Sequence, residues 1–442
     1  MKTMIASVKK SMKAARGPRV REGLSVVRRG LPAILVGIGL LLGGCASRGA
    51  GGDGLGYYWQ SLRGQMHLLQ ASRPIDDWLQ DESLAPALRE RLLSARRMRA
   101  FAVERLGLPD NASYRRYADL QRPFAVWNVV AAPPDSLELH RWCFPVAGCV
   151  GYRGYFAEAD AMAQARQLAD QGLESGSYGV PAYSTLGYLN WLGGDPLLNT
   201  FIGWGEGEFA GLLFHELAHQ VVYVAGDTAF NESFATTVER LGTPLWLATE
   251  AGPAARARWD AGQLRRAQWR ALTGHTRQAL QQLYQDPQQR GPAMAQAKAQ
   301  IYQQFRSDYA ALRAQWRSAD AALLTTDAQR QLYDRNQARL DQWVADANNA
   351  SFGALAAYDD WVPAFTALWK QSQTQAPAQA GGEATQGWQR FYAEVEKLAA
   401  LPALQRNTRL CGLMPADASL PPACAPDQDR ASVSTHGSHP GN

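Results

Sequence analysis

The sequence carries little excess charge beyond its first residues, and this argues against a protein that binds nucleic acid. Residues 1–29 hold nine Lys and Arg residues and one Glu, and residues 30–44 hold no charge. The rest of the chain has 36 basic and 39 acidic residues. The pI of about 8.9 therefore reflects the N-terminus alone. Because phosphate backbones are bound by clustered Lys and Arg, we predict no nucleic-acid partner.

Long apolar runs and several enzyme motifs are also missing. The apolar segment Leu31–Leu42 has twelve residues, whereas a helix needs about 20 to cross a bilayer core. No Gly-x-Ser-x-Gly element indicates a serine hydrolase, and no Cys-x-x-Cys pair indicates a zinc knuckle or a redox site. Residues 253–347 are rich in Ala, Gln and Arg but have no sustained heptad, so they predict two or three long packed helices.

The N-terminal residues have the order of a secretory signal, with a cationic segment, the apolar segment and then two glycines before Cys45. The run Leu42-Gly43-Gly44-Cys45 resembles a bacterial lipobox. The resemblance implies that Cys45 is lipidated and becomes the first mature residue. We therefore expect a lipoprotein of the bacterial cell envelope that faces the periplasm and is held to the membrane by its lipid.

Two alternatives remain open for this segment. Ala46-Ser47 after the cysteine favours the outer membrane over the inner one, and Arg28-Arg29 also allows a twin-arginine signal. Translation could begin at Met4 or Met12 instead of Met1.

Four cysteines remain once Cys45 is assigned to lipid, and an oxidising periplasm permits disulfides between them. Four cysteines allow three pairings. Closeness in sequence favours the pairs Cys143–Cys149 and Cys411–Cys424.

The pattern predicts an α+β protein that is mainly helical. Residues 124–130, 149–156 and 179–186 are rich in β-formers and predict a small mixed or antiparallel sheet, with a helix over residues 158–172. The C-terminal region reads as helical.

We divide the chain into five parts. Residues 1–44 are the signal peptide, and residues 45–56 are the lipidated cysteine with a flexible, Gly-rich tether. Residues 57–250 form the catalytic domain, and residues 251–410 form a helical region that completes the cleft. Residues 411–442 are a Cys-containing tail, largely disordered because it has few apolar residues.

One motif points to chemistry. A helix expected over residues 208–224 carries His215-Glu216-Leu217-Ala218-His219, in which the two histidines share one face and can reach the same metal ion. Zinc suits two imidazoles and a carboxylate, with a fourth position for water. Glu216 would take a proton from that water and pass it to the leaving amine.

The third metal ligand is less directly indicated by the sequence than the two histidines are. Glu232 opens a second helix, expected over residues 232–241, which follows a turn at residues 225–227. Asp227 is a rival because a turn residue can point back at the metal, and Glu239 is a more distant candidate. If Glu232 is the ligand, Asp227 could instead orient an imidazole from the second coordination shell.

The segments around the motif resemble a known family. Residues 214–220, 226–228 and 230–235 are similar to the predicted bacterial aminopeptidases, a family of zinc-dependent lipoproteins, and the likeness extends over residues 57–401. The resemblance implies a zincin-like core, one Zn²⁺ per chain and a peptide or protein substrate. The family often has Asp four residues after the ligand Glu, and here Thr236 stands there.

We therefore expect a zinc-dependent peptidase, with aminopeptidase as the first interpretation. An aminopeptidase must hold the substrate's ammonium group, for which Asp195, Glu206 and Glu208 are candidates. The two glutamates would equally favour a helix N-terminus.

An oxyanion also needs a donor, and Tyr183, Tyr223 and Tyr152 are the candidates for the oxyanion or substrate site. The alternatives are an envelope endopeptidase or assembly factor, and a non-catalytic binding lipoprotein.

Overall fold

The computed structural model describes residues 54–144, 148–185, 193–321, 325–356, 359–374, 383–416, 418 and 421–424. The chain divides into two compact units, residues 1–59 and 60–442. In the first unit only residues 54–59 are described, and they are helical. The predicted signal peptide, Cys45 with most of its tether, and the tail from residue 425 lie outside the described residues. Among the described residues, no helix combines the length and apolarity that a membrane span requires.

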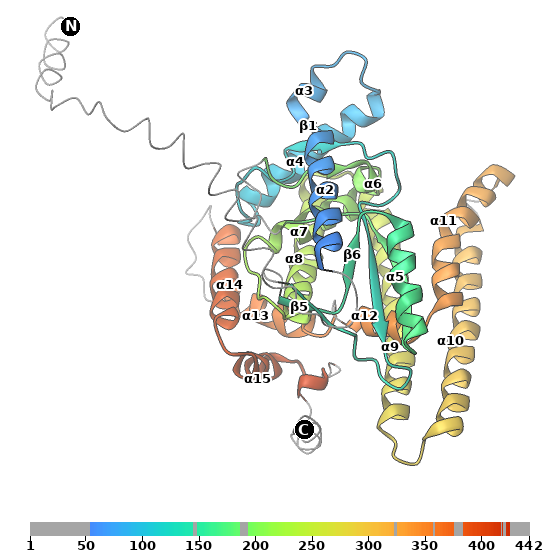
Figure 1. Cartoon of the computed structure of the whole chain (residues 1–442). Coiled ribbons are helices and arrows are strands. Elements are labelled where there is room, and N and C mark those ends of the chain that lie inside the picture. The colour runs from blue at the N-terminus through green and yellow to red at the C-terminus, as the bar shows by residue number, and fades with distance from the viewer. Residues whose placement is uncertain are drawn as a thin grey trace, which may run out of the picture. The chain divides into compact units, whose positions relative to one another are not determined.

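The described chain is mainly helical, as the sequence predicts, but its strands form three small sheets where one was expected (Figure 1). The helices that precede the His215–His219 motif are α2 (Gly54–Ala71), α3 (Ile75–Leu79), α4 (Pro86–Glu104), α5 (Glu158–Asp170) and α6 (Asn199–Ile202). The helices from the site onward are α7 (Glu206–Ala218), α8 (Thr228–Thr249), α9 (Pro253–Gln285), α10 (Gly291–Asp320), α11 (Asp327–Asp346), α12 (Asn349–Ala356), α13 (Val362–Thr374), α14 (Glu383–Ala399), α15 (Ala403–Leu413) and the 3₁₀ turn η3 (Pro422–Cys424).

The central strand of the largest ladder is β3 (Val126–Ala132), which pairs antiparallel with β6 (Arg153–Tyr155) and β7 (Glu174–Val180). Every residue of β3 is buried, and both α5 and α12 pack against β3 and β7. This explains why its sequence is a continuous apolar run with a single Asn instead of an alternating pattern.

The remaining described strands form two further sheets. In a mixed sheet, β1 (Ser72–Pro74) pairs antiparallel with β2 (Arg116–Ala118), which pairs parallel with β8 (Leu197–Leu198). A hairpin joins β4 (Trp142–Phe144) to β5 (Gly148–Val150).

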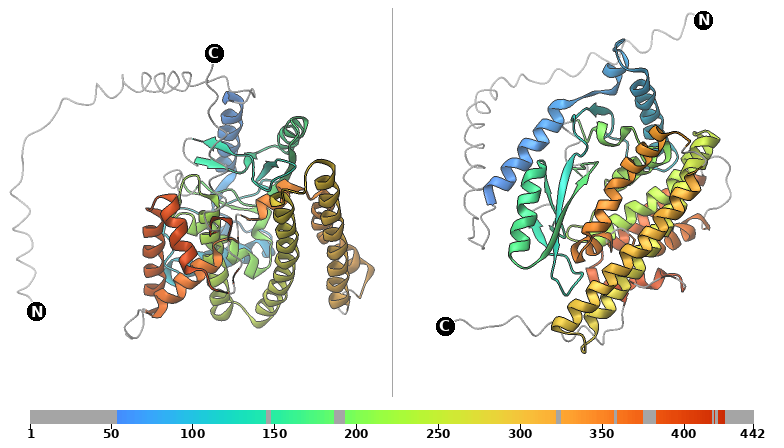
Figure 2. Two further views of the ribbon diagram at one scale, coloured as in Figure 1. Left: turned by 90° about the horizontal axis from the view of Figure 1, so that it is seen from below. Right: turned by 90° about the vertical axis from the view of Figure 1, so that its right-hand side faces the viewer.

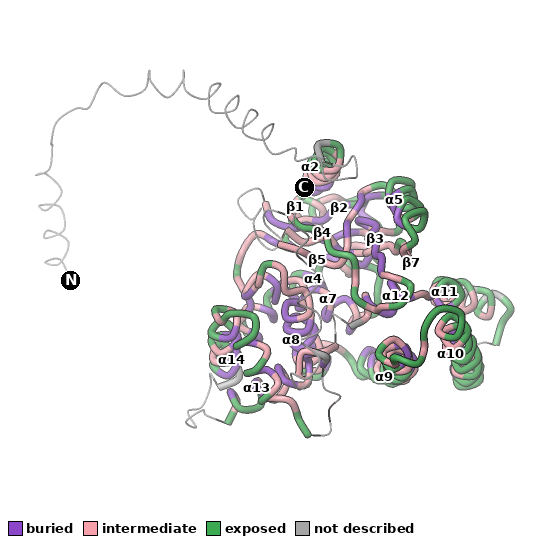
Figure 3. The backbone as a smooth tube through the Cα atoms, turned by 60° about the horizontal axis from the view of Figure 1, so that its bottom comes forward, coloured by how far each residue is buried: buried purple, intermediate pink, exposed green. Residues whose placement is uncertain are grey.

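Helices α7 and α8 pack along each other at the centre of the main core (Figure 3). The four phenylalanines of these two helices, Phe209, Phe214, Phe230 and Phe234, are fully buried. Helices α13, α14 and α15, which come near the C-terminus, cover α8. The ring of Phe365 on α13 contacts the rings of Phe230 and Phe234 on α8. The large apolar area buried here makes these two helices a rigid support for the polar side chains they carry.

The helices predicted over residues 253–347 are confirmed. Helices α9 and α10 form a long hairpin, followed by α11 (Figure 2). Trp269, Phe305 and Trp343 contact one another through their rings and form the core of this region together with Phe352. The buried Asn349 ties the hairpin to the sheet, because it accepts from Tyr284 and Tyr302 and donates to the carbonyl of Pro133.

Several predicted boundaries are wrong. The strand expected over residues 149–156 is split between β5 and β6, which belong to different sheets. The strand expected over residues 179–186 ends at Val180, because Pro181 has no N–H to continue the ladder.

The helix expected over residues 208–224 begins at Glu206 and ends at Ala218, since three β-branched valines follow and the chain must turn back. The helix expected over residues 232–241 is longer and includes Pro244.

Candidate metal centre

The two histidines of the motif lie one turn apart at the end of α7. His219 is the C-cap, and its backbone still has helical angles, so the i, i+4 relation holds. The residues His215 and His219 are only 8% and 6% exposed. Their Nε2 atoms lie 3.2 Å apart. Both imidazoles therefore point the same nitrogen at one position, as the spacing predicts.

A tight turn brings the second helix back over these rings. Gly226 has a φ of 80°, which a residue with a side chain rarely adopts. The Asp227 carboxylate caps α8 by accepting from Phe230 N at 3.1 Å. The Asn231 side chain bonds both the N–H and the carbonyl of Val224 at 2.8 Å. Together these bonds place the first turn of α8, which carries Glu232, beside the end of α7.

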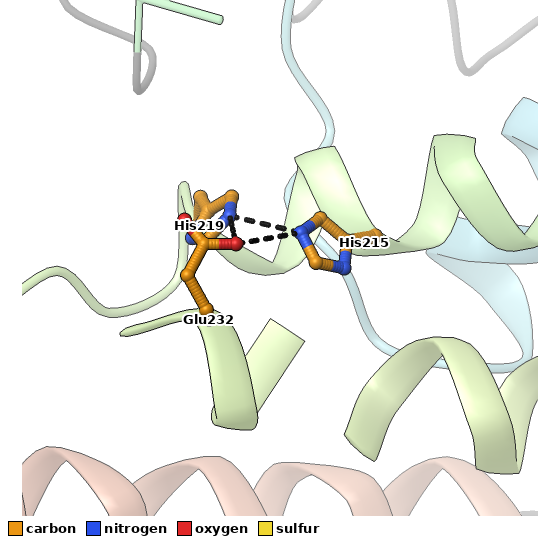
Figure 4. Close-up of side chains that lie close together, drawn as sticks. All are labelled: His215, His219 and Glu232. Atoms are coloured by element: carbon orange, nitrogen blue, oxygen red, sulfur yellow. Dashed lines mark hydrogen bonds and ion pairs between the residues drawn. The ribbon is translucent and has the colours of Figure 1, made fainter. Parts of the chain in front are cut away.

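Glu232 completes a compact group of three ligand atoms (Figure 4). Its Oε2 atom lies 3.3 Å from His215 Nε2 and 3.7 Å from His219 Nε2. Around a zinc ion with N and O ligands at about 2.0–2.2 Å, the edges of a coordination tetrahedron are about 3.3–3.6 Å long. The triangle with edges of 3.2, 3.3 and 3.7 Å matches one face of such a tetrahedron. The residues present thus fit a zinc ion with one position left for water or substrate.

The charges in this group are strongly coupled. Burial by itself lowers the pKa of His215, but the Glu232 and Glu239 carboxylates outweigh it and raise that pKa to about 10. Burial by itself raises the pKa of Glu232, whereas His219 and His215 hold it well below its usual range. Glu232 is therefore ionised at neutral pH, and His215 carries a proton when no metal is bound. The positive charge of that proton occupies the place of a metal cation.

A second carboxylate holds the first imidazole from its other side. Glu239, two turns beyond Glu232 on α8, lies with Oε2 at 3.4 Å from His215 Nδ1. The pKa of Glu239 would be raised by burial but is lowered by His215 and by the nearby Arg240 and Arg266. A carboxylate at this nitrogen fixes the ring orientation and tautomer of a metal ligand.

Asp227, predicted for this orienting role or as a rival ligand, contacts other groups in the structure. The Asp227 carboxylate is occupied by the cap of α8 and by Arg406 of α15, whose Nη2 lies 2.6 Å away. Arg406 is 4% exposed. Asp227 thus fixes the turn between the ligands, and Glu239 takes the place beside the imidazole.

Glu216 lies beside the ligand triangle and is not part of it. Burial raises the pKa of Glu216, and the positive charges of His215 and His219 offset part of this rise. The Ser184 hydroxyl hydrogen-bonds the same carboxylate and also lowers its pKa. A carboxylate with a raised pKa suits proton transfer.

Two tyrosines lie close enough to Glu232 to sense its charge. Burial and the charge of Glu232 raise the pKa of both Tyr152 and Tyr178, and Tyr152 also senses Tyr223 and Glu216. The phenols of Tyr152 and Tyr178 stay protonated and can donate hydrogen bonds. Tyr183, predicted at the site, contacts Phe156 with a ring separation of 5.2 Å.

The carboxylates predicted to hold an ammonium group are engaged elsewhere. Glu208 accepts from Arg266 at 2.8 Å, and Glu206 interacts with Arg91. Asp195 is 1% exposed and accepts from Thr185 Oγ1 at 2.8 Å. Burial raises the pKa of Asp195 to about 6.

Both predicted cysteine pairs are bonded, and one disulfide lies next to the turn between the ligands. Cys143–Cys149 joins β4 to β5, and Cys411–Cys424 joins α15 to η3. Arg141 donates to the carbonyls of Cys149 at 2.7 Å and Gly226 at 3.0 Å. The disulfide-bonded hairpin is therefore attached to the turn that sets the distance between His219 and Glu232.

Sequence reasoning missed the roles of Glu239, Arg406 and Ser184. For Glu239 a signal existed, because it lies seven residues after Glu232 and hence on the same helix face. For Arg406 and Ser184 the sequence holds no signal, since both reach the site from distant segments.

Comparison with protein families matches residues 56–410 to a family described as "Putative aminopeptidase". Comparison with curated proteins and with solved structures gives no significant match.

Proposed function

The chain belongs to the "Putative aminopeptidase" family, and on this premise we propose that it is a zinc-dependent peptidase with a zincin-like core. In this proposal His215, His219 and Glu232 hold one Zn²⁺ per chain. The observation that carries the proposal is the triangle of ligand atoms, whose edges of 3.2–3.7 Å suit tetrahedral zinc.

Each side chain near the triangle has a separate task in hydrolysis. A bound Zn²⁺ would polarise the scissile carbonyl and acidify the attacking water. Glu216 accepts the proton of that water and returns it to the leaving amine, a role favoured by its raised pKa. Tyr152 and Tyr223 are the candidates to donate hydrogen bonds to the oxygen that becomes negative in the transition state.

Removal of N-terminal residues is the activity in the family's name, and it needs a partner for the substrate's ammonium group. Among the described residues, Asp195, Glu206 and Glu208 each already interact with groups of the chain itself. This favours an endopeptidase, or a factor acting on envelope proteins, as the second candidate. Peptides of one sequence with free and with acetylated N-termini separate the two, because an aminopeptidase cleaves only the free form.

The cell location is part of the same proposal. We propose that Cys45 carries a lipid that anchors the protein in the bacterial cell envelope facing the periplasm. The two disulfides support this, since disulfides persist in oxidising compartments. Mass spectrometry of the N-terminal peptide from membranes should find a diacylglyceryl group on Cys45, and an unmodified Cys45 would refute the anchor.

The decisive experiment measures metal content and peptide cleavage in the wild type and three variants. We expect about one zinc per wild-type chain and near-complete loss in Glu232→Ala. Glu216→Gln should keep the metal and lose nearly all cleavage. Glu158→Gln, at an exposed site on α5, is the matched control and should behave as wild type. Full cleavage by zinc-loaded Glu216→Gln would refute the mechanism, and absence of zinc from the wild type after metal addition would refute the metal site.

A further inference from the structure

The two histidines of the motif are held in different ways. His215 lies within α7, and its Nδ1 atom lies 3.4 Å from the Glu239 carboxylate. His219 is the C-cap of α7, and its buried Nδ1 atom has no hydrogen-bond partner among the described residues. The backbone at the end of a helix opens more readily than the backbone within it, because the last carbonyls lack the regular bonds. A ligand at this place depends on support from outside the helix.

The side chain that follows His219 provides such support. Gln220 Oε1 accepts from Asn111 Nδ2 at 2.6 Å, and Gln220 Nε2 donates to Ser113 Oγ at 3.2 Å. Asn111 Oδ1 accepts from the backbone N–H of Ser113 at 3.0 Å, so the amide nitrogen of Asn111 is the group that faces Gln220. The two bonds of Gln220 thus join the end of α7 to a loop that comes 107 to 109 residues earlier in the chain.

A buried cation fixes this loop to α4. Arg99 of α4 is 3% exposed. Its Nη2 donates to the carbonyls of Pro109 at 2.6 Å and Asn111 at 3.3 Å, and its Nε donates to the carbonyl of Ser113 at 3.2 Å. Burial lowers the pKa of Arg99 to about 10. The guanidinium therefore stays charged at neutral pH, and its bonds to the loop are charge-assisted.

Asp195 holds the same loop through its backbone. The N–H of this buried residue donates to Ser113 Oγ at 3.2 Å, and its carbonyl accepts from Tyr114 N at 2.6 Å. Gly194 allows the close approach, because a Cβ there would lie 2.5 Å from Ser113 N. Ser113 Oγ has two lone pairs and accepts from both Asp195 and Gln220. The loop is thus a rigid support for the Gln220 amide.

We infer that Gln220 is a positioning residue for His219. Its side chain ties the C-terminal end of α7 to the loop of residues 109–114 and so keeps the His219 ring at its corner of the ligand triangle. Gln220 acts through the backbone of its neighbour, in the place where His215 has a carboxylate at its ring. The inference rests on the proposed function, since it takes His219 as a zinc ligand.

Three variants test this role. Gln220→Met has a side chain of similar length and lacks the amide, and Asn111→Ala removes the partner of Gln220 Oε1. Gln268→Met is the matched control, because the half-buried Gln268 of α9 accepts from Trp316 Nε1 of α10 at 2.8 Å. Competition with a chromophoric chelator measures the zinc affinity, at a temperature where urea unfolding shows that each variant is folded.

We expect Gln220→Met to bind zinc about tenfold more weakly than the wild type, because the imidazole is held less firmly. Asn111→Ala should lose a similar factor. The double variant should lose about tenfold and not about a hundredfold, since both substitutions break the same contact. Gln268→Met should match the wild type. Unchanged zinc affinity in Gln220→Met, or an equal loss in Gln268→Met, would overturn the inference.

A second readout needs neither metal nor catalysis. Hydrogen exchange of the metal-free protein, followed by mass spectrometry, reports how often the end of α7 opens. The peptide that contains His219 should exchange about tenfold faster in Gln220→Met than in the wild type, because two hydrogen bonds are lost. In Gln268→Met it should exchange at the wild-type rate.

The two readouts separate this inference from the proposed function. If the wild type binds zinc and Gln220→Met binds it equally well, only the inference fails. If the wild type binds no zinc after metal addition, the proposed function fails. The exchange of the His219 peptide then decides whether Gln220 holds this residue in place: faster exchange in Gln220→Met supports the inference, and the wild-type rate overturns it.

Discussion

The carboxylate of Glu239 lies 3.4 Å from Nδ1 of His215, on the opposite side of the ring from the other ligand atoms. Glu232 approaches the Nε2 atom of the same ring from an earlier turn of the same helix. Helix α8 thus provides one carboxylate that could bind a metal together with His215 and another that orients the His215 ring. A tilt of this helix would disturb both contacts together.

Replacing Glu239 should weaken metal binding without removing a ligand. We expect Glu239→Gln to lower zinc affinity by about tenfold to a hundredfold, because the amide holds the imidazole less firmly than a carboxylate does. Competition with a chromophoric chelator measures this. Glu250→Gln, at the exposed end of the same helix, should match the wild type, and an unchanged affinity in Glu239→Gln would contradict the orienting role.

Removing the charge of Asp227 should destabilise the fold while leaving the metal ligands in place. Asparagine still caps a helix, but Asp227→Asn leaves the buried Arg406 without its partner, at a cost of about 3 kcal/mol. Urea unfolding of the metal-free protein measures the loss. Asp260→Asn breaks an exposed pair with Arg256 and should cost less than about 1 kcal/mol.

The same Asp227→Asn protein tests the rival assignment. With its folded state intact at low urea, it should still bind about one zinc per chain, because Asp227 contacts Arg406 and the helix N-terminus. Loss of zinc from a folded Asp227→Asn would make Asp227 a ligand after all.

Zinc loading should release protons at neutral pH. The pKa of His215 is about 10 without metal, so its imidazole is charged at pH 7.5, whereas a metal ligand must be neutral. Loading should therefore release about one proton per zinc, and affinity should rise with pH up to about 10. Calorimetry in two buffers of different ionisation enthalpy counts the protons. Zero release at pH 7.5 would show that the ring is already neutral.

The same shift has a consequence for the stability of the metal-free protein. Folding raises the pKa of His215 from 6.5, so protonation of this ring stabilises the folded state fully below about pH 6.5. That contribution is lost as the pH rises toward about 10. Unfolding of metal-free His215→Gln should show a smaller decline between pH 7 and 10 than the wild type does.

Contact between the disulfide-bonded hairpin and the turn can be tested with one glycine. Gly148 has a φ of 73°, and a Cβ there would lie 2.5 Å from the backbone nitrogen of Gly226. Gly172 has a φ of 85° and nothing within 4 Å of its Cβ position. Both alanine variants bear backbone strain of about 1 kcal/mol, but only Gly148→Ala should also push the turn away and weaken zinc binding. Equal zinc affinity in the two variants would contradict this coupling.

Local patterns predicted the parts of the molecule that depend on neighbouring residues. The i, i+4 spacing of His215 and His219 placed both imidazoles on one face, since helix geometry alone sets it. Apolar periodicity predicted the three helices α9, α10 and α11. The two disulfides join cysteines that lie close in the chain.

Boundaries were less predictable, because contacts with distant segments decide them. The three valines after His219 look like a continuation of α7, yet the chain turns there to bring α8 against it. Whether the segment at residues 149–156 forms one strand or two depends on which partner each half finds.

The motif alone specifies the chemical groups of the site: two imidazoles and a neighbouring carboxylate on a buried helix. Which other carboxylates contact the imidazoles depends on how the helices pack. Asp227 and Glu239 are equally acidic in sequence, but Arg406 of α15 holds the first and packing of α8 on α7 delivers the second to His215. Which carboxylate contacts which imidazole depends on residues that lie far apart in the chain. Packing of the whole core determines which of these residues become neighbours.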